Sequence, residues 1–185
     1  MRYEYADVYK IRDQGATHFL TFSIIGSIDI FSRKKYRDII LESLRFCQKN
    51  KNLKIGAYVI MTNHIHLILT APNNNLSDII RDFKTYTSKA ITKTIESESE
   101  SRREWLLYMF RFYANRTAAN DYYKVWTGNN HPEEICSDDF LITKLNYIHQ
   151  NPVRAGIVIE AAHYTYSSAS NYKQKKGLLD IDFLF

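Results

Sequence analysis

The chain has 185 residues, of which 45% are hydrophobic and 24% charged, a composition typical of one soluble globular domain rather than a disordered or fibrous chain. No apolar stretch approaches the length of a membrane span, and residues 1–5 show no signal-peptide pattern, so we expect no membrane association. The net charge of +5 points mildly to an anionic partner. Cys47 and Cys136 have no metal or redox spacing, which is consistent with reduced thiols in a cytoplasm.

A length of 185 residues suits a single domain over residues 1–185. Runs rich in β-forming residues predict strands, and apolar residues at helical spacing predict helices. In chain order we predict a strand over 18–25, a helix over 35–50, paired strands over 54–61 and 64–70, helices over 76–95 and 102–116, a short strand near 123–126, and a helix that starts at Ser137 or Asp138 and ends at Pro152 and Gly156.

This order of elements predicts an α+β fold. It resembles the ferredoxin-like (RRM-like) split βαβ arrangement, an antiparallel sheet with helices on one face. The last helix is an addition to that arrangement.

His64 and His66 lie one residue apart in the second of the paired strands. Since alternate residues of a strand face the same side of a sheet, both imidazoles point the same way and offer two ligands to one metal ion. The alternative is a pair of surface histidines on a half-exposed sheet. Because two ligands alone make a poor site, the pair indicates a metal centre only together with a third ligand and a reactive group.

Positive and aromatic side chains are interleaved over residues 101–130. Cations follow the phosphates of a strand while rings stack on unpaired bases, so this segment predicts a surface for single-stranded nucleic acid with contacts from Arg102, Arg103 and Trp126. The alternative for any one ring is a place in the core. Lys84, on the polar face of the preceding helix, is predicted to contact phosphate or to lie in solvent.

Tyr147 and Asn151 are four residues apart on the last helix and therefore share a face. A phenol nucleophile beside an amide oxygen that completes a His, His, Asn metal site is a coherent set for phosphoryl transfer. Taken alone, Tyr147 is expected to be a packing residue, because the chain contains 14 tyrosines.

Other residues compete for these roles. Tyr86 is a rival nucleophile, but Ala90 stands where a polar partner would follow it by one helical turn. His131 and His149 are rival ligands; His149 points about 200° around the helix from Tyr147.

Two segments carry a resemblance to a known family: Met61-Thr-Asn-His-Ile-His-Leu-Ile-Leu69 and Tyr147-Ile-His-Gln-Asn-Pro-Val-Arg-Ala-Gly-Ile-Val158. Together they resemble the REP-associated tyrosine transposases, a branch of the single-tyrosine, His-hydrophobic-His transposase superfamily. Trp126 and residues 130–135 and 166–169 also resemble that group, so the similarity covers about residues 17–172. The resemblance therefore implies a core over about 17–172 and a tail over 173–185. The resemblance implies the ferredoxin-like fold, with the two histidines on a central strand and the tyrosine helix packed over that face.

The resemblance also implies roles for individual residues. His64 and His66 would bind a divalent ion, Mg²⁺ or Mn²⁺, and Tyr147 would be the nucleophile. Asn151 matches the polar third-ligand position one helical turn beyond, where related insertion-sequence transposases commonly have Gln. Arg154 is expected to contact DNA. Nitrogen ligands favour Mn²⁺ over Mg²⁺, and imidazole would also accept Zn²⁺.

The predicted function is that of a metal-dependent single-stranded DNA endonuclease and strand-transferase that forms a 5'-phosphotyrosyl link at hairpin or repeat DNA. One alternative is an inactive DNA-binding protein of the same fold, against which the intact set of site residues argues. Another is an unrelated ferredoxin-like RNA-binding module, which would carry aromatics where His64 and His66 stand.

The expected setting is a bacterial cytoplasm, with the protein at the nucleoid when it is bound to DNA. We favour a monomer over a homodimer because residues 102–120 and the tail after Tyr172 add material that could cover a dimer surface.

Overall fold

A computed structural model describes residues 10–116 and 122–184. The segment predicted to lack a signal peptide, and the last residues of the 102–120 region predicted to cover a dimer surface, lie outside the described residues. Within the described part of the chain, no helix combines the length and apolar character needed to span a membrane.

The described elements form a four-stranded antiparallel sheet with helices, which confirms the α+β class. The strand order is β2-β3-β1-β4. The ferredoxin-like name stays a prediction, because β4 has only two residues and an additional helix precedes it. The bounds are β1 His18–Ser23, α1 Lys34–Lys51, β2 Lys54–Ile60, β3 His64–Thr70, α2 Leu76–Ser97, α3 Arg103–Ala114, β4 Glu133–Glu134, α4 Asp138–Arg154 and α5 Ala169–Tyr172.

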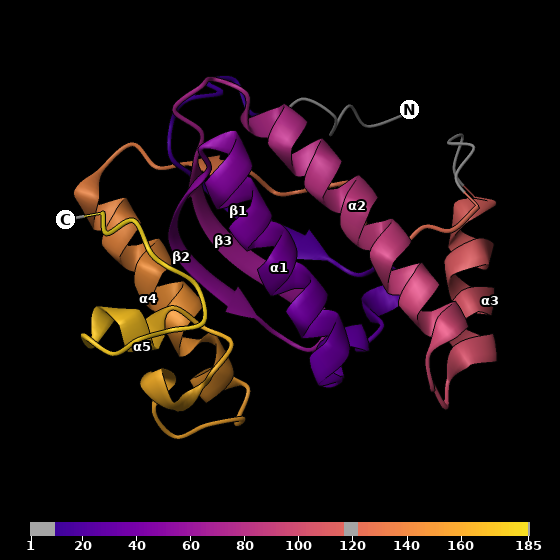
Figure 1. The fold of residues 1–185 in the computed structure, drawn as a ribbon. Helices are drawn as coiled ribbons and strands as arrows, with labels where there is room; N and C mark the ends of the chain where they lie inside the picture. Colours follow the sequence, from indigo (N-terminus) through magenta and orange to yellow (C-terminus); the bar gives the residue numbers. More distant parts are fainter. Residues whose placement is uncertain (1–9, 117–121, 185) are drawn as a thin grey trace, which may run out of the picture.

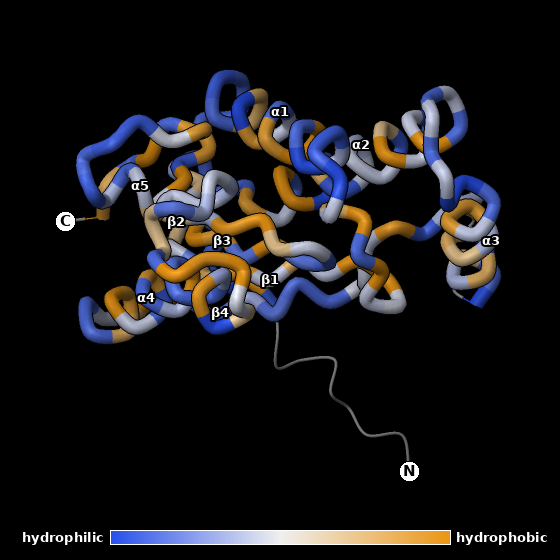
Figure 2. Tube along the Cα trace, turned by 90° about the horizontal axis from the view of Figure 1, so that it is seen from below, coloured by the Kyte–Doolittle hydropathy of each residue, from blue (hydrophilic) through white to orange (hydrophobic). Residues whose placement is uncertain are grey.

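Helices cover both faces of the sheet. Figure 2 shows α1 and α2 on one side of the strands and α4 on the other. Pairing of β1 with β3 sets the faces: Leu20 opposes Leu67 in the larger core beneath α1 and α2, whereas Phe19 opposes Ile68 in the smaller core beneath α4. Because both faces are buried, the central strands read as nearly continuous apolar runs, as buried strands do.

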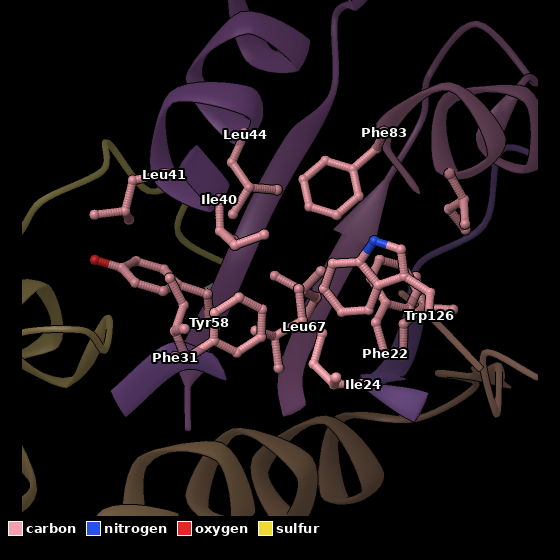
Figure 3. Packing of buried hydrophobic residues seen from close by; sticks show 14 of the residues in the cluster. Phe22, Ile24, Phe31, Ile40, Leu41, Leu44, Tyr58, Leu67, Phe83 and Trp126 are labelled. Atoms are coloured by element: carbon pink, nitrogen blue, oxygen red, sulfur yellow. The ribbon is translucent and has the colours of Figure 1, made fainter. Parts of the chain in front are cut away.

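The larger core contains an aromatic group around Trp126. The indole is 5% exposed and lies with Phe22, Phe31 and Phe83 (Figure 3). Its Nε1–H donates a hydrogen bond of 3.0 Å to the Thr87 hydroxyl. The prediction that Trp126 stacks on bases is therefore wrong, since packing and a buried hydrogen bond occupy the ring.

The backbone beside Trp126 also differs from the prediction. No strand forms over 123–126; Trp126 makes only an isolated bridge to Ile24. The fourth strand lies later in the chain, where Glu133 and Glu134 pair with the start of β1. Pairings this short depend on tertiary context more than on local β propensity.

Helix α4 begins and ends as expected. The Ser137 hydroxyl accepts a hydrogen bond of 3.3 Å from the Phe140 amide, which confirms the N-cap. The helix continues two residues past Pro152 to Arg154, so it ends between the two residues predicted to mark its end, Pro152 and Gly156. Gly156, with a φ of 69°, turns the chain away. The additional residues bring Arg154 back towards Tyr147.

The chain after α4 covers the free edge of β2. Tyr166 O accepts from Ile60 N at 2.9 Å, Ser168 N donates to Tyr58 O at 3.0 Å, and Asp182 N donates to Ile55 O at 3.0 Å. The outer backbone groups of β2 are therefore bonded to the same chain.

Candidate active site

His64 and His66 lie on β3 on the face covered by α4. In the register of the sheet, His66 opposes Thr21 and His64 opposes Ser23 on β1. The two ring centroids are 4.7 Å apart. Strand alternation therefore brings both imidazoles to one place, as the spacing predicted.

Hydrogen bonds orient both rings through their Nδ1 atoms. His66 Nδ1 lies 2.8 Å from the Thr21 hydroxyl, and His64 Nδ1 lies 2.6 Å from the Asn63 amide oxygen. An amide oxygen only accepts, so His64 carries its proton on Nδ1 and has a lone pair on Nε2. The buried Nε2 of His66 has no hydrogen-bond partner. Both Nε2 atoms are thus suited to bind a metal ion, with Thr21 and Asn63 fixing the rings.

Burial keeps the histidines neutral. His66 is 4% exposed, and this burial, with the positive charges that His64, Lys144 and Arg154 can carry, lowers its pKa to about 3. Burial also lowers the pKa of His64. Neutral imidazole is the form that ligates metals, so the pair is in the required state at physiological pH.

Tyr147 reaches this place from α4. Its ring centroid is 5.0 Å from that of His66 and 5.8 Å from that of Phe19, in edge-on contacts. The side chain is 39% exposed, so a substrate can approach it. Arg154 lies with its guanidinium 4.5 Å from the ring centroid and donates a hydrogen bond of 3.0 Å to the Tyr147 carbonyl. A strand of the sheet and the helix that covers one of its faces therefore meet at one site.

The residues present fit a divalent ion. No group of three or more His, Cys, Asp or Glu side chains that could hold a metal occurs among the residues that the structure describes. Asn151 is half-buried one helical turn after Tyr147 and stays the predicted third ligand. Two neutral imidazoles with one amide oxygen leave further positions for phosphate oxygens and water, as catalytic sites require.

Sequence reasoning missed two residues of this site. Thr21 is visible only when the register of β1 against β3 is known. Lys144 precedes Tyr147 by one helical turn, which was a usable signal. Its ammonium lies 4.5 Å from the Phe19 ring centroid and 2.7 Å from Glu133 Oε1, so it is held beside the histidine face.

The remaining predicted DNA contacts have partners within the chain. Arg102 pairs with Asp29 at 2.6 Å, and Arg103 donates to backbone carbonyls at the end of α2, including Ile95 O at 2.9 Å. Lys84 donates to neutral acceptors in the segment before β4. Their contacts with DNA stay predictions.

The rival site residues lie elsewhere. Tyr86 is 63% exposed on α2, in the layer opposite α4. His149 is 9% exposed, and its Nε2 lies 2.9 Å from the Ser168 hydroxyl. His131 lies in the loop before β4, with a φ of 40°.

Comparisons with known proteins found a family model and a solved structure that match this chain. The model of a family described as IS200-like transposases matches residues 20–127, which include both histidines and end before Tyr147. No curated protein matches the chain. A solved structure, of a REP-associated tyrosine transposase bound to a REP hairpin, is similar with a TM-score of 0.65 and 18% sequence identity, covering 96% of this chain and 90% of that one. At this identity the likeness shows the fold.

Proposed function

Because the chain belongs to the IS200-like transposase family, we propose that it is a metal-dependent endonuclease and strand-transferase for single-stranded DNA, with Tyr147 as its nucleophile. The observation that carries the proposal is the contact between the Tyr147 ring and His66, at 5.0 Å between centroids. Family membership supports transposition as the class of reaction. The contact supports a tyrosine mechanism within that class.

His64 and His66 would hold the metal ion through Nε2, with Asn151 as the third protein ligand. When bound, the ion supplies Lewis-acid stabilisation of charge on the scissile phosphate and fixes that phosphate's orientation. Family resemblance and the donor set favour Mg²⁺ or Mn²⁺.

Cleavage begins with the phenol oxygen of Tyr147. That oxygen attacks phosphorus in line, a new O–P bond forms, and the bond to the 3'-oxygen of the preceding nucleotide breaks. The phenol proton passes to water, and the departing 3'-oxygen takes a proton from water. The products are a 5'-phosphotyrosyl link and a free 3'-hydroxyl.

Strand joining is the same chemistry in reverse. The 3'-hydroxyl of another strand attacks the phosphotyrosyl phosphorus and loses its proton to water as the new 3'-O–P bond forms. The Tyr147–phosphorus bond breaks, and the phenol oxygen takes a proton from water. Because the energy of the diester is kept in the tyrosyl link, no nucleotide cofactor is required.

Lys144 and Arg154 place positive charge on either side of the nucleophile. Arg154 lies against the Tyr147 ring, and Lys144 lies against Phe19 beneath it. Both side chains are suited to phosphates flanking the scissile one. The similar structure that is bound to a REP hairpin supports hairpin DNA with an unpaired segment as the substrate of this chain.

The nucleophile is tested with Tyr147→Phe, which removes one oxygen and leaves the ring in place. We expect that this variant forms no covalent protein–DNA product from a 3'-labelled hairpin with an unpaired extension, in a denaturing gel assay with Mn²⁺, because a 5'-phosphotyrosyl link retains the 3' fragment. Binding should change little, since the ring contacts remain.

Tyr86→Phe is the matched control, because Tyr86 is the more exposed tyrosine on the opposite layer. It should form the covalent product at the wild-type rate. A covalent product in Tyr147→Phe would overturn the assignment of the nucleophile. DNA binding without a covalent product in the wild-type protein would instead favour an inactive DNA-binding protein.

A further inference from the structure

A polar hollow lies between α2 and the segment that follows α3. None of the proposed catalytic residues line it. Its volume is about 320 Å³. Residues of α2 and of the segment 122–126 line it, among them Lys84, Lys89, Lys124, Ser88 and Tyr122. In Figure 1 the described residues that lead towards α4, from Tyr122 on, pass behind α2. The hollow is therefore built by tertiary packing of two chain segments.

Among the described residues that line this hollow there are three lysines and no aspartate or glutamate. Lys84 Nζ donates to Thr127 O at 2.8 Å and to Asn130 Oδ1 at 2.6 Å, which are both neutral acceptors. An ammonium has three protons, so one donor remains for a ligand. Burial, together with the charge of Lys124, lowers the pKa of Lys84 to about 8. A partly buried cation that has only neutral partners is stabilised when an anion binds beside it.

One acidic side chain beside the hollow, that of Glu96, is hydrogen-bonded to a tyrosine that lines it. Glu96 Oε1 accepts a hydrogen bond of 3.1 Å from the Tyr123 hydroxyl. Arg111 adds another cation beside the hollow, with its guanidinium 4.3 Å from the Tyr122 ring centroid. The surroundings therefore favour an anion as well.

The shape and the exposed ring indicate what kind of anion fits. The volume suits a unit of nucleotide size, whereas a duplex is too wide to enter such a hollow. Tyr122 is 64% exposed and presents a ring to any base beside the phosphate. Proteins commonly bind single strands through lysines that contact phosphates and aromatic rings that stack on bases.

A series of hydrogen bonds links Lys84, at the hollow, to His66 across the edge of β1. Asn130, whose side chain bonds Lys84, accepts from Thr21 N through its carbonyl at 2.9 Å. Thr21 in turn bonds His66. A strand that runs from Tyr147 around the β1 edge would thus reach Lys84.

We infer that this hollow binds an unpaired segment of the DNA substrate outside the cleavage position, with phosphates on Lys84, Lys89 and Lys124 and a base on Tyr122. The inference rests on the proposed function for the identity of the strand. It assigns to α2 and the segment after α3 the task of holding DNA that the catalytic residues do not touch.

The test compares two double variants with equal loss of charge, each made in a Tyr147→Phe background to prevent covalent capture. Lys89→Gln with Lys124→Gln alters the hollow and leaves the structural bonds of Lys84 in place. Lys49→Gln with Lys93→Gln is the matched control, since Lys49 and Lys93 are exposed on α1 and α2 and do not line the hollow.

Binding is measured by fluorescence anisotropy at several salt concentrations, with a labelled DNA hairpin that carries an unpaired extension. We expect the hollow variant to bind at least tenfold more weakly than the control variant. Its slope of log K against log salt should be less steep by about 1.4, which is about 0.7 for each of two lost phosphate contacts on a single strand. A blunt hairpin should bind both variants equally.

Three outcomes would overturn the inference: equal salt slopes for the two variants, an equal loss of affinity on the blunt hairpin, which would assign the hollow to duplex DNA, or tighter binding of an RNA of the same sequence. The covalent assay, made with the wild-type protein whose Tyr147 is intact, separates this inference from the proposed function. If the wild-type protein forms no covalent adduct but the hollow variant has an altered salt slope, only the tyrosine mechanism is refuted. If the adduct forms normally but the salt slope of the hollow variant is unaltered, only the DNA-binding role of the hollow is refuted.

Discussion

At the scale of single residues, His66 has an unfavourable arrangement that metal binding would relieve. Its Nε2 is buried without a partner, a condition that costs about 1–3 kcal/mol of folding free energy. Its Nδ1 is held by the Thr21 hydroxyl, so the ring cannot turn to satisfy the other nitrogen without losing that bond. Unfavourable arrangements of this kind are expected at functional sites. A bound ion would supply the partner that Nε2 lacks, with Nδ1–H donating to the Thr21 hydroxyl.

This arrangement predicts that Mn²⁺ stabilises the folded protein. At a concentration one hundred times its Kd, an ion that binds only the folded state adds about 2.7 kcal/mol. For a chain of this size we expect a rise in melting temperature of about 5–10 °C. The rise should vanish in His64→Ala and in His66→Ala and be reduced in Asn151→Ala, because water replaces an amide oxygen more easily than an imidazole. Differential scanning fluorimetry with and without EDTA measures it; an undiminished rise in His66→Ala would place the ion elsewhere.

Thr21 is predicted to be a positioning residue. Thr21→Val keeps the shape of the side chain and removes the hydroxyl that orients His66. We expect Mn²⁺ affinity, measured by calorimetry, to fall by about 10–100-fold, the usual effect of losing an outer-shell hydrogen bond. Thr21→Ser restores the hydroxyl and should recover most of the affinity. Equal affinities for the Val and Ser variants would contradict the role.

At the scale of secondary-structure elements, local patterns predicted the elements that have strong periodicity. The strand over 64–70 matches β3, and the helices over 35–50 and 76–95 match α1 and α2 within two residues at each end. The fourth strand was placed wrongly, because two residues of pairing leave no periodic signal. Trp126 was misassigned because a run of aromatic residues does not itself show which rings are buried.

The candidate site was predictable to a similar extent. Strand alternation placed His64 and His66 on one face, and family resemblance supplied Tyr147. The contacts from Thr21 and Lys144 depend on strand register and on how α4 packs, which no local pattern encodes. The hollow beside α2 likewise needs Lys84 and Lys124 to be brought together from separate segments.

The packing of α2 against the segment before β4 gives a pH prediction. Lys84 has its pKa lowered to about 8, so it is charged below that pH in the free protein and loses its proton as the pH rises through it. An anion favours the charged form, so DNA affinity should fall as the pH rises above about 8. Lys84→Arg stays charged and should show a smaller fall.

Anisotropy between pH 7 and 9.5 with the extended hairpin measures this difference. The other titratable side chains at the hollow are common to both proteins and cancel in the comparison: Lys89, Lys124, Tyr122, Tyr123 and Glu96. Parallel curves for the wild-type and Lys84→Arg proteins would show that Lys84 does not face the DNA.

At the scale of the whole molecule, the residues that follow α4 cover the free edge of the sheet at β2. An edge strand with free N–H and C=O groups invites pairing with a second copy. Here the residues after α4 bond that edge of β2, and Leu184 lies so close to Gly56 that a side chain at position 56 would collide with it. Leu179 is 2% exposed in the larger core, which anchors the tail. The arrangement supports the predicted monomer.

Removing the tail should therefore change the oligomeric state. A chain that ends at Lys176 loses Leu179 and the bonds between Asp182 and Ile55, so part of the β2 edge becomes free. We expect the full-length protein to sediment as a monomer and this truncated chain to associate with increasing concentration, in analytical ultracentrifugation. A chain that ends at Asp182 keeps those bonds and should remain monomeric, with circular dichroism as the check that both truncated chains are folded. A full-length protein that sediments as a dimer would show that covering β2 does not prevent self-association, and another surface would then have to join the two copies.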